Sequence, residues 1–388
     1  MNKKIIIHVG FQKTGSSSIQ HFFRDVLKKN KTNKLAYPKF YNKFTGNYSY
    51  NHSTALFSIY SSKWREYHIN KKLKLSAINL EKLNQDYKDQ FRKFLNECAA
   101  DTIVLSGEDL SILPKQELKN LLEDLRSNFN NGNFECKVIA YTRHPLRLFI
   151  SEVQQSVKGG LSLDQAINVR LRNASILFLN KLESLKDVFG DGLEIFEFEN
   201  AVTYSGGLVK HFIDNAGLNS YFEASQRFSY ISNEGYSLEA LELLSAINVN
   251  IPLFIDGNLS ELRKGNDFLM FQSIKGVKFS VSSNVQDAFY SRSANSIEVL
   301  RNNYGLDYNL ERVEVFDLMW NEKSCLDLKM LFPKLKKEFR QVILWYFQAK
   351  FIELKNENSN CAVTYLRVLK VVRPTMKVVA MFESEYKI

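Results

Sequence analysis

The residues best suited to chemistry stand near the amino terminus, where a lysine and three serines follow a short apolar run. The run, residues 5–9, predicts a buried strand, and Gly10 and Gly15 bound the turn after it. The serines at 16–18 begin a segment whose apolar residues recur at helical spacing. The first N–H groups and the dipole of a helix attract anions, and Lys13 adds a full positive charge. This strand–turn–helix pattern predicts a phosphate-binding loop.

The spacing differs from that of the Walker A loop. Gly10 and Gly15 have the Walker spacing, but that motif places lysine directly after the second glycine, before a Ser or Thr that binds magnesium. Here Ser16 follows Gly15, and Lys13 comes two residues before Gly15. The lysine would meet an anion from the strand side of the turn. The alternative interpretation of the same residues is an ordinary strand–turn–helix segment with a lysine on the surface.

A second group of polar residues follows another apolar run, residues 138–141. Arg143 stands at the end of this predicted strand, and Pro145 stands where a helix can begin. Ser151 comes eight residues after Arg143, about two turns into that helix. A guanidinium and a hydroxyl suit a phosphate monoester by charge and by bidentate geometry. The alternative is an arginine in a surface salt bridge and a serine that faces solvent.

The first motif resembles the 5′-phosphosulfate loop of sulfotransferases that use 3′-phosphoadenosine 5′-phosphosulfate (PAPS). In that family a strand leads into a Lys-[ST]-Gly-[ST]-[ST] turn. The matching residues are Lys13, Thr14, Gly15, Ser16 and Ser17, with Ser18 completing the serine run. The string HVGFQKTGSSSIQ is most similar to the bacterial, cytosolic branch of the family.

The second motif resembles the 3′-phosphate site of the same family. That site is an arginine that ends a strand and a serine eight residues later, often with proline two residues after the arginine. Arg143, Pro145 and Ser151 match it residue by residue. Both motifs occur in the family's order and in the expected strand–helix context.

The resemblance implies transfer of a sulfuryl group from PAPS to an acceptor hydroxyl or amine, with 3′-phosphoadenosine 5′-phosphate (PAP) as product and no metal. Such a transfer resembles loose, in-line phosphoryl transfer, in which catalysis is mainly positioning and charge stabilisation. Lys13 would neutralise the leaving 5′-phosphate oxygen. The loop N–H groups and the hydroxyls at 16–18 would hold the non-bridging oxygens.

An acceptor hydroxyl also needs a general base, and the sequence offers two candidates. Glu108 follows a third predicted strand, residues 102–106, at the edge where Arg143 also lies. Glutamate serves as base in several glycan sulfotransferases, but it has to be partly desolvated to raise its pKa. His52 lies in the region expected to cover the acceptor, and imidazole is the usual base in the cytosolic animal branch. The structural alternative for Glu108 is a carboxylate stabilised by the dipole at a helix N-terminus, and that for His52 is a loop or helix-capping histidine.

Two other classes of function stay open. An atypical P-loop nucleotide kinase or NTPase would need magnesium, and a non-catalytic module for nucleotides or anionic glycans would bind PAPS without turnover. For a sulfotransferase of the bacterial branch, we expect a saccharide or lipid-linked saccharide as acceptor, and hence carbohydrate sulfation.

Composition agrees with an anionic partner. The 388 residues carry a formal charge of +10, with 45% hydrophobic and 24% charged residues, as in a globular protein. There is no arginine-rich tract or nucleic-acid motif, so no nucleic-acid partner is expected. The four cysteines lack metal-ligand spacing and no apolar window reaches membrane-span length. We therefore expect a cytoplasmic protein, and the basic apolar stretch 366–382 could touch the inner membrane surface or pack on the main domain.

Strands and helices alternate over the first 217 residues, which predicts an α/β fold with a central parallel sheet flanked by helices. The expected strands are 5–9, 102–106, 138–141 and 193–198, and the expected helices are 76–98, 115–128, two within 162–189, and 206–217. Residues 30–75 predict loops and short helices. We expect a sulfotransferase domain over residues 1–310, with the P-loop-like fold of that family, and a helical C-terminal extension over 311–388. Within the domain, residues 261–268 resemble the Arg-Lys-Gly segment that closes over the nucleotide in cytosolic members of the family. The alternative is a basic surface loop.

Overall fold

The computed structural model describes residues 3–29, 34–222, 228, 235–316, 320–356 and 359–386. The chain divides into two units. The first comprises Met1–Pro145, Ile176–Asn233 and Ser296–Tyr308, and the second comprises Leu146–Ser175, Glu234–Asn295 and Asn309–Ile388. The residues beyond 310 group with two earlier segments, and the predicted domain boundary at 310 stays a prediction.

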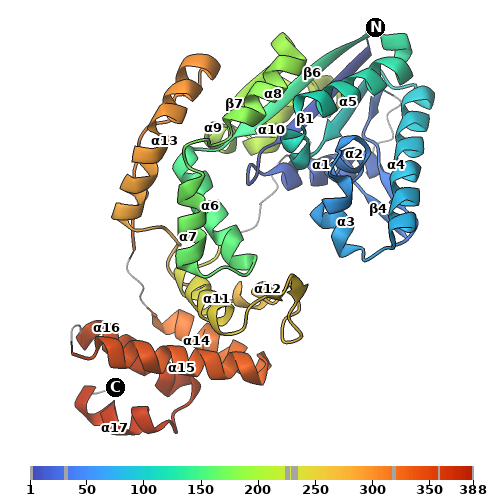
Figure 1. The fold of residues 1–388 in the computed structure, drawn as a ribbon. Helices are drawn as coiled ribbons and strands as arrows, with labels where there is room; N and C mark the ends of the chain where they lie inside the picture. The colour runs from blue at the N-terminus through green and yellow to red at the C-terminus, as the bar shows by residue number, and fades with distance from the viewer. Residues whose placement is uncertain are drawn as a thin grey trace. The chain divides into compact units, whose positions relative to one another are not determined.

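Five parallel strands form the sheet of the first unit (Figure 1). Their order is β2 (Leu35–Ala36), β5 (Thr102–Ser106), β1 (Lys3–Gly10), β6 (Phe134–Thr142) and β7 (Leu193–Glu197). The central strand β1 is hydrogen-bonded on both sides, and Ile7 pairs with Leu105 of β5 and Val138 of β6. Central parallel strands are covered on both faces, which explains why β1 is buried continuously from Ile5 to Gly10. The predicted central parallel sheet is confirmed.

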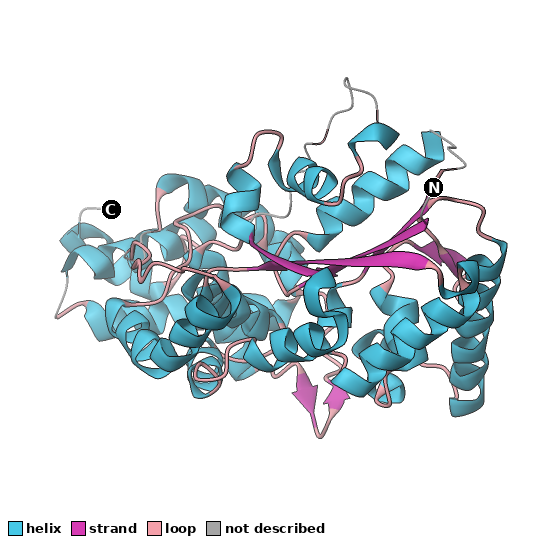
Figure 2. Ribbon diagram, turned by 90° about the horizontal axis from the view of Figure 1, so that it is seen from above, coloured by secondary structure: helices cyan, strands magenta, loops and turns pink. Residues whose placement is uncertain are grey.

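Helices cover both faces of this sheet (Figure 2). On one face, α1 (Ser16–Lys29) and α10 (Gly207–Asn215) pack on the strands through a core that includes Phe22, Tyr141 and Phe212. Helix α8 (Leu179–Phe189) packs on β6 and β7, and α5 (Lys115–Asn128) packs against α8. The carboxyl ends of the strands therefore share one edge between two helical layers.

The helices expected from periodicity are present with small shifts of their ends. They are α4 (Ala77–Glu97), α5, α7 (Leu163–Arg172), α8 and α10. Ser76 caps α4, and Ser162 forms a capping box with Gln165 at the start of α7. These side chains satisfy N–H groups that a helix start leaves without a partner, and so fix where the helices begin.

Residues 34–75 contain the short helices that were expected and two features that were not. The helices are α2 (Ser53–Tyr60) and α3 (His68–Lys72), and α2 packs on α4. The unexpected features are the edge strand β2 and the hairpin of β3 (Phe40–Asn42) with β4 (Asn47–Ser49). Strands of two or three residues are too short to leave a periodic signal.

The second unit is mainly helical and contains one small hairpin. Before position 310 it contains α6 (Pro145–Lys158), α7, α11 (Leu238–Asn250), α12 (Phe268–Phe271) and the hairpin β8 (Phe254–Ile255)–β9 (Asn258–Leu259). Helix α13 (Ser283–Tyr304) runs through both units, and α9 (Phe198–Thr203) belongs to the first. Phe149 of α6 packs against Phe289 of α13 within the second unit, their ring centroids 4.9 Å apart.

The C-terminal segment is helical, as predicted. Its helices are α14 (Glu322–Leu331), α15 (Lys337–Leu354), α16 (Ser359–Val372) and α17 (Lys377–Tyr386). Tyr346 of α15 donates a hydrogen bond to Glu242 of α11 at 2.6 Å, which attaches this segment to an earlier helix. In the stretch 366–382, Leu366, Leu369 and Val379 are fully buried, so these apolar side chains serve packing. Across the described residues, no helix is both long and apolar enough to cross a membrane.

The segment 261–268 differs from a basic surface loop. Arg263 is only 4% exposed, forms an ion pair with Asp267 at 3.0 Å, and donates hydrogen bonds to Asn248 Oδ1 and the Ile251 carbonyl. The guanidinium joins the end of α11 to the turn before α12. The charge of Arg263 is therefore neutralised inside the second unit.

Candidate active site

Four consecutive strands of the sheet, β5, β1, β6 and β7, each end in a segment that bears a charged residue. Glu108 follows β5, Lys13 follows β1, Arg143 follows β6, and Glu199 follows β7. The carboxyl edge of an open parallel sheet is where ligands bind in α/β proteins. The topology thus brings Lys13, Arg143 and one candidate base, Glu108, to the same edge of the first unit.

The turn between β1 and α1 is held in a conformation that few residues adopt. Gly15 has φ +72°, and Lys13, which has a side chain, has φ 65°. A Cβ at Gly15 would lie 2.5 Å from Leu208 and 3.2 Å from Phe198, so glycine is required by space as well as by φ. An exposed lysine in the left-handed region marks a backbone that its surroundings constrain.

The hydroxyl groups of the turn differ in what they contact. Thr14 is buried and donates to the Phe11 carbonyl at 2.6 Å, so its hydroxyl stabilises the turn itself. Ser17 is exposed, whereas Ser18 is buried in the first turn of α1. Ser16 is 4% exposed, and within the described structure its Oγ has no hydrogen-bond partner. A buried hydroxyl without a hydrogen-bond partner destabilises the folded state. Of the three serines, Ser16 is therefore the one that would gain most from a hydrogen bond to a bound group.

Close packing holds Ser16 against the end of β1. A Cβ at Gly10 would lie 1.7 Å from Ser16 Oγ, closer than any real contact, so a side chain at position 10 would displace the hydroxyl. Both glycines that bound the turn are therefore required by contacts, and the serine run begins α1 as the sequence predicted.

Arg143 connects the second motif to the first. Its Nη1 donates to the carbonyl of Lys13 at 3.4 Å, and its Nε lies 3.6 Å from Oε1 of Glu199. The guanidinium carbon also lies 5.7 Å from the ring centroid of Phe198. The side chain of Arg143 is 25% exposed, so part of it stays accessible at the sheet edge. The salt bridge that was the alternative for a strand-end arginine is thus present, and it lies beside the turn between β1 and α1.

Ser151 is on α6, two turns after Arg143, and is half-buried. Residues 146–158 of this helix belong to the second unit. Its pairing with Arg143 across a 3′-phosphate stays a prediction.

Glu108 has the electrostatic properties expected of a general base. It lies in a short 3₁₀ turn, Glu108–Ile112, directly after β5. Burial raises the pKa of Glu108 to about 7, neighbouring Asp109 adds to this rise, and the charges of Lys13 and Lys181 oppose it. The influence of Lys13 on this pKa reports that the lysine of the turn and the carboxylate share one electrostatic environment. A pKa near the working pH suits proton transfer.

His52 is engaged in the structure of the first unit. Its Nδ1 accepts from the backbone N–H of Ser106 at 2.8 Å, and its Nε2 lies 2.7 Å from the carbonyl of Pro38. The ring is fully buried, and burial lowers the pKa of His52 to about 4. Because both nitrogens are occupied, His52 acts in this conformation as a link between β5 and the segment before β3. This environment favours Glu108 over His52 as the base.

Two charged residues near this edge, Glu199 and Lys181, were not identified from the sequence motifs. Glu199 could have been found by applying the carboxyl-end rule to the predicted fourth strand, since it follows β7 by two residues. Lys181 lies on α8, with its Nζ 5.8 Å from the ring centroid of Phe11. No sequence signal identifies it, because a half-exposed lysine on an amphipathic helix is ordinary.

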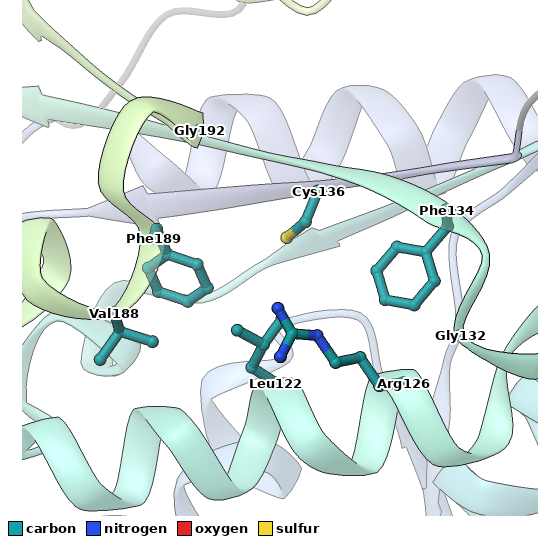
Figure 3. Close-up of a pocket in the computed structure, with 8 residues that line it drawn as sticks. All are labelled: Leu122, Arg126, Gly132, Phe134, Cys136, Val188, Phe189 and Gly192. Atoms are coloured by element: carbon teal, nitrogen blue, oxygen red, sulfur yellow. The ribbon is translucent and has the colours of Figure 1, made fainter.

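A separate small cavity lies beside the amino-terminal end of β6 (Figure 3). It has a volume of about 210 Å³ and is lined by Leu122, Arg126, Gly132, Phe134, Cys136, Val188, Phe189 and Gly192. Phe134 begins β6, so the cavity is at the amino ends of the strands, away from Lys13. Ligand pockets usually measure roughly 300–1,000 Å³, and none of the predicted site residues lines this one.

The cysteines Cys98, Cys136, Cys325 and Cys361 form no disulfide bonds with one another. Among the residues that the structure describes, no group of three or more His, Cys, Asp or Glu is arranged to hold a metal ion.

No family model matches the chain, and no curated protein matches it. Among solved structures, the chain is similar to the "Sulfotransferase Domain from the Curacin Biosynthetic Pathway", with 15% sequence identity and a TM-score of 0.33. The similarity covers 75% of this chain and 97% of that domain.

Proposed function

We propose that this protein is a sulfotransferase that moves the sulfuryl group of PAPS to an acceptor hydroxyl or amine. The observation that carries the proposal is the convergence of Lys13, Glu108 and Arg143 at the carboxyl edge of adjacent strands. The turn after β1 supplies the charge of Lys13 and the N–H groups of a helix start. The segment after β5 supplies the carboxylate of Glu108, whose pKa is raised, and the segment after β6 supplies the guanidinium of Arg143. These three groups suit a nucleotide with anionic groups at both its 5′ and 3′ positions and an acceptor that gives up a proton.

The residues of the turn fit the donor substrate. The Ser16 hydroxyl is buried without a hydrogen-bond partner, and an anion oxygen bound in the turn would accept from it. The N–H groups of the first turn of α1 supply further donors at the positive end of the helix dipole. Lys13 is exposed at the mouth of the turn, where its charge would stabilise the leaving 5′-phosphate oxygen. Thr14 and Gly15 would hold the backbone of the turn in shape.

The acceptor side depends on Glu108. When its carboxylate is ionised, it can take the proton of the acceptor hydroxyl as the S–O bond forms, and Lys13 balances the opposite change at the leaving oxygen. We propose that His52 has a structural role, linking β5 to the segment before β3, and is not the base, because its two ring nitrogens already contact backbone groups.

The 3′-phosphate of the nucleotide would bind to Arg143 and Ser151. A guanidinium at a strand end offers two parallel N–H groups to a phosphate, and the hydroxyl adds one hydrogen bond. Arg143 already contacts the carbonyl of Lys13, which supports the idea that both phosphates of one nucleotide are bound by neighbouring segments.

For the acceptor we propose a saccharide or lipid-linked saccharide. We also propose that the enzyme works in the cytoplasm, where cysteines outside disulfides stay reduced. A lipid-linked acceptor would require contact with the inner surface of the membrane. The positive net charge of the chain supports both an anionic donor and an anionic membrane surface.

The test compares thermal stabilisation of the purified protein by PAP, by ATP with magnesium, and by AMP. A ligand that binds only the folded state raises the melting temperature according to its affinity and concentration. We expect PAP to stabilise selectively. Stabilisation by ATP with magnesium instead would support the kinase or NTPase alternative. PAP binding without sulfation of any saccharide tested with PAPS would support a non-catalytic module.

A further inference from the structure

One carboxylate is attached to both halves of the turn that follows β6. Oε2 of Glu199 accepts a hydrogen bond from the backbone N–H of His144 at 3.0 Å, and Oε1 lies 3.6 Å from Nε of Arg143. His144 is the residue before Pro145, where α6 begins. Glu199 therefore holds the backbone of this turn and the guanidinium of Arg143 at the same time.

The residue before Glu199 packs on the other motif. Phe198 lies 3.2 Å from the position that a Cβ at Gly15 would occupy, and the guanidinium of Arg143 lies 5.7 Å from its ring centroid. Phe198 and Glu199 are the first two residues of α9, directly after β7. The start of α9 thus supports the phosphate-binding turn with an apolar contact and Arg143 with a polar one.

We propose that Glu199 is a positioning residue that sets the enzyme's preference for nucleotides bearing a 3′-phosphate, an inference that rests on the proposed function. An arginine side chain has many rotamers, and an ion pair that orients its Nε before the ligand arrives reduces the ordering needed on binding. The hydrogen bond to His144 keeps that carboxylate in place, because an acceptor at the start of α6 satisfies an N–H that the helix leaves without a partner.

Glu199 is also an anion close to where an anionic group would bind. Its negative charge partly balances Arg143, so a nucleotide without the 3′-phosphate gains little from this part of the site. Orientation by the ion pair and repulsion by charge make opposite predictions for substitutions: loss of the ion pair lowers the affinity for PAP, whereas removal of a repelling negative charge raises it. Glu199→Gln keeps a carbonyl oxygen for His144 and removes the charge, whereas Glu199→Ala removes both.

The experiment measures the dissociation constants of PAP and AMP by calorimetry for the full-length protein and its variants. We expect Glu199→Ala to reduce the preference for PAP over AMP at least tenfold, with AMP affinity unchanged within twofold. Glu199→Gln keeps an acceptor for His144 but loses the ion pair with Arg143, so it should also reduce the preference. Glu197→Ala, which removes a half-buried carboxylate two residues earlier that accepts from Asn200, serves as the matched control and should change neither constant.

Three results would overturn the inference. They are an unchanged preference in Glu199→Ala, an equal loss for PAP and AMP, and an unchanged preference in Glu199→Gln. In an Arg143→Ala background, Glu199→Ala should have no further effect on the preference, and an additive loss would also contradict a role through Arg143. If Glu199→Ala does not fold, Glu199→Asp, which withdraws the carboxylate by one methylene, carries the same expectation. A wild-type protein without preference for PAP would overturn the proposed function itself.

Discussion

The chain contains two basic segments that resemble nucleotide-binding motifs, residues 10–18 and residues 261–268, and the structure uses them differently. In the first, Lys13 is exposed at φ 65°, and Ser16 has a buried hydroxyl without a hydrogen-bond partner. In the second, Arg263 is buried, paired with Asp267, and bonded to two acceptors of the α11 end. One segment presents polar groups to a ligand, and the other uses its charge for internal structure.

The difference lies in the partners of the charged groups. In both segments a basic residue comes two positions before a glycine, but only the second segment has an acidic residue four positions after that basic residue. A buried arginine with a dedicated carboxylate has few donors left for a ligand. Charge therefore identifies an anion site only together with the acceptors that surround it.

The largest effect is expected for Arg263→Ala. Removal of one partner of a buried ion pair leaves the carboxylate of Asp267 buried and uncompensated, which costs about 3–5 kcal/mol of the free energy of unfolding. Urea unfolding followed by circular dichroism measures this loss. Lys264→Ala, at an exposed neighbour in the same segment, is the control and should stay within about 0.5 kcal/mol of wild type. Wild-type stability in Arg263→Ala would contradict a structural role.

The opposite pattern is expected for Lys13→Ala, because this side chain is exposed and its charge is needed only as the leaving oxygen develops charge. Stability should be unchanged, while the transition state loses about 2.7–4 kcal/mol, or roughly 10²–10³ in turnover. Single-turnover sulfation with saturating PAPS measures the effect, and Gln12→Ala, at the exposed neighbour in the turn, is the control. Near-normal transfer by Lys13→Ala would remove the basis of the mechanism.

Much of the first unit could be predicted because its signals are local. The β-branched runs of β1, β5 and β6 and the apolar stripe of α4 specify their own structures, and a parallel sheet follows from their alternation. The short strands β2, β3 and β4 escaped prediction because two or three residues have no period. The predicted positions of Lys13, Glu108 and Arg143 at one edge followed from the strand ends alone.

What could not be predicted depends on contacts between distant residues. His52 reads as an available base until Ser106 and Pro38 are found on its two nitrogens. Arg263 reads as a surface cation until Asn248 is found beside it. In each case the deciding partner is far away in the sequence or comes from another element, and burial of the side chain is a property of the folded chain.

A smaller effect is expected at the second motif. Arg143→Ala should abolish the preference for PAP over AMP, since a hydrogen bond to a charged group contributes about 1.5–3 kcal/mol and only the 3′-phosphate would receive it. Ser151→Ala removes a neutral donor and should reduce the preference by about 0.5–1.5 kcal/mol. Calorimetric titration with both nucleotides measures this, with AMP binding as the internal control for folding. Unchanged preference in both variants would show that the motif is assigned wrongly.

The smallest effect distinguishes the two candidate bases by their pKa values. With the pKa of Glu108 at about 7, the ionised fraction that can accept a proton falls about tenfold between pH 8 and pH 6, and kcat/KM should fall with it. With the pKa of His52 at about 4, that ring stays neutral throughout this range and would give no change. Initial rates of sulfation, measured between pH 6 and pH 8 at constant ionic strength, give the dependence of kcat/KM on pH.

Substitutions then identify the group that titrates. Glu108→Gln should lower the activity and remove its dependence on pH between 6 and 8. Lys181 lowers the pKa of Glu108, so Lys181→Ala should raise that pKa and move the fall in activity to higher pH, whereas a base at His52 predicts no shift. Glu108→Gln with the wild-type profile, together with intact nucleotide binding, would require a different base. The position of the titration thus reports directly which side chain of the sheet edge takes the proton of the acceptor.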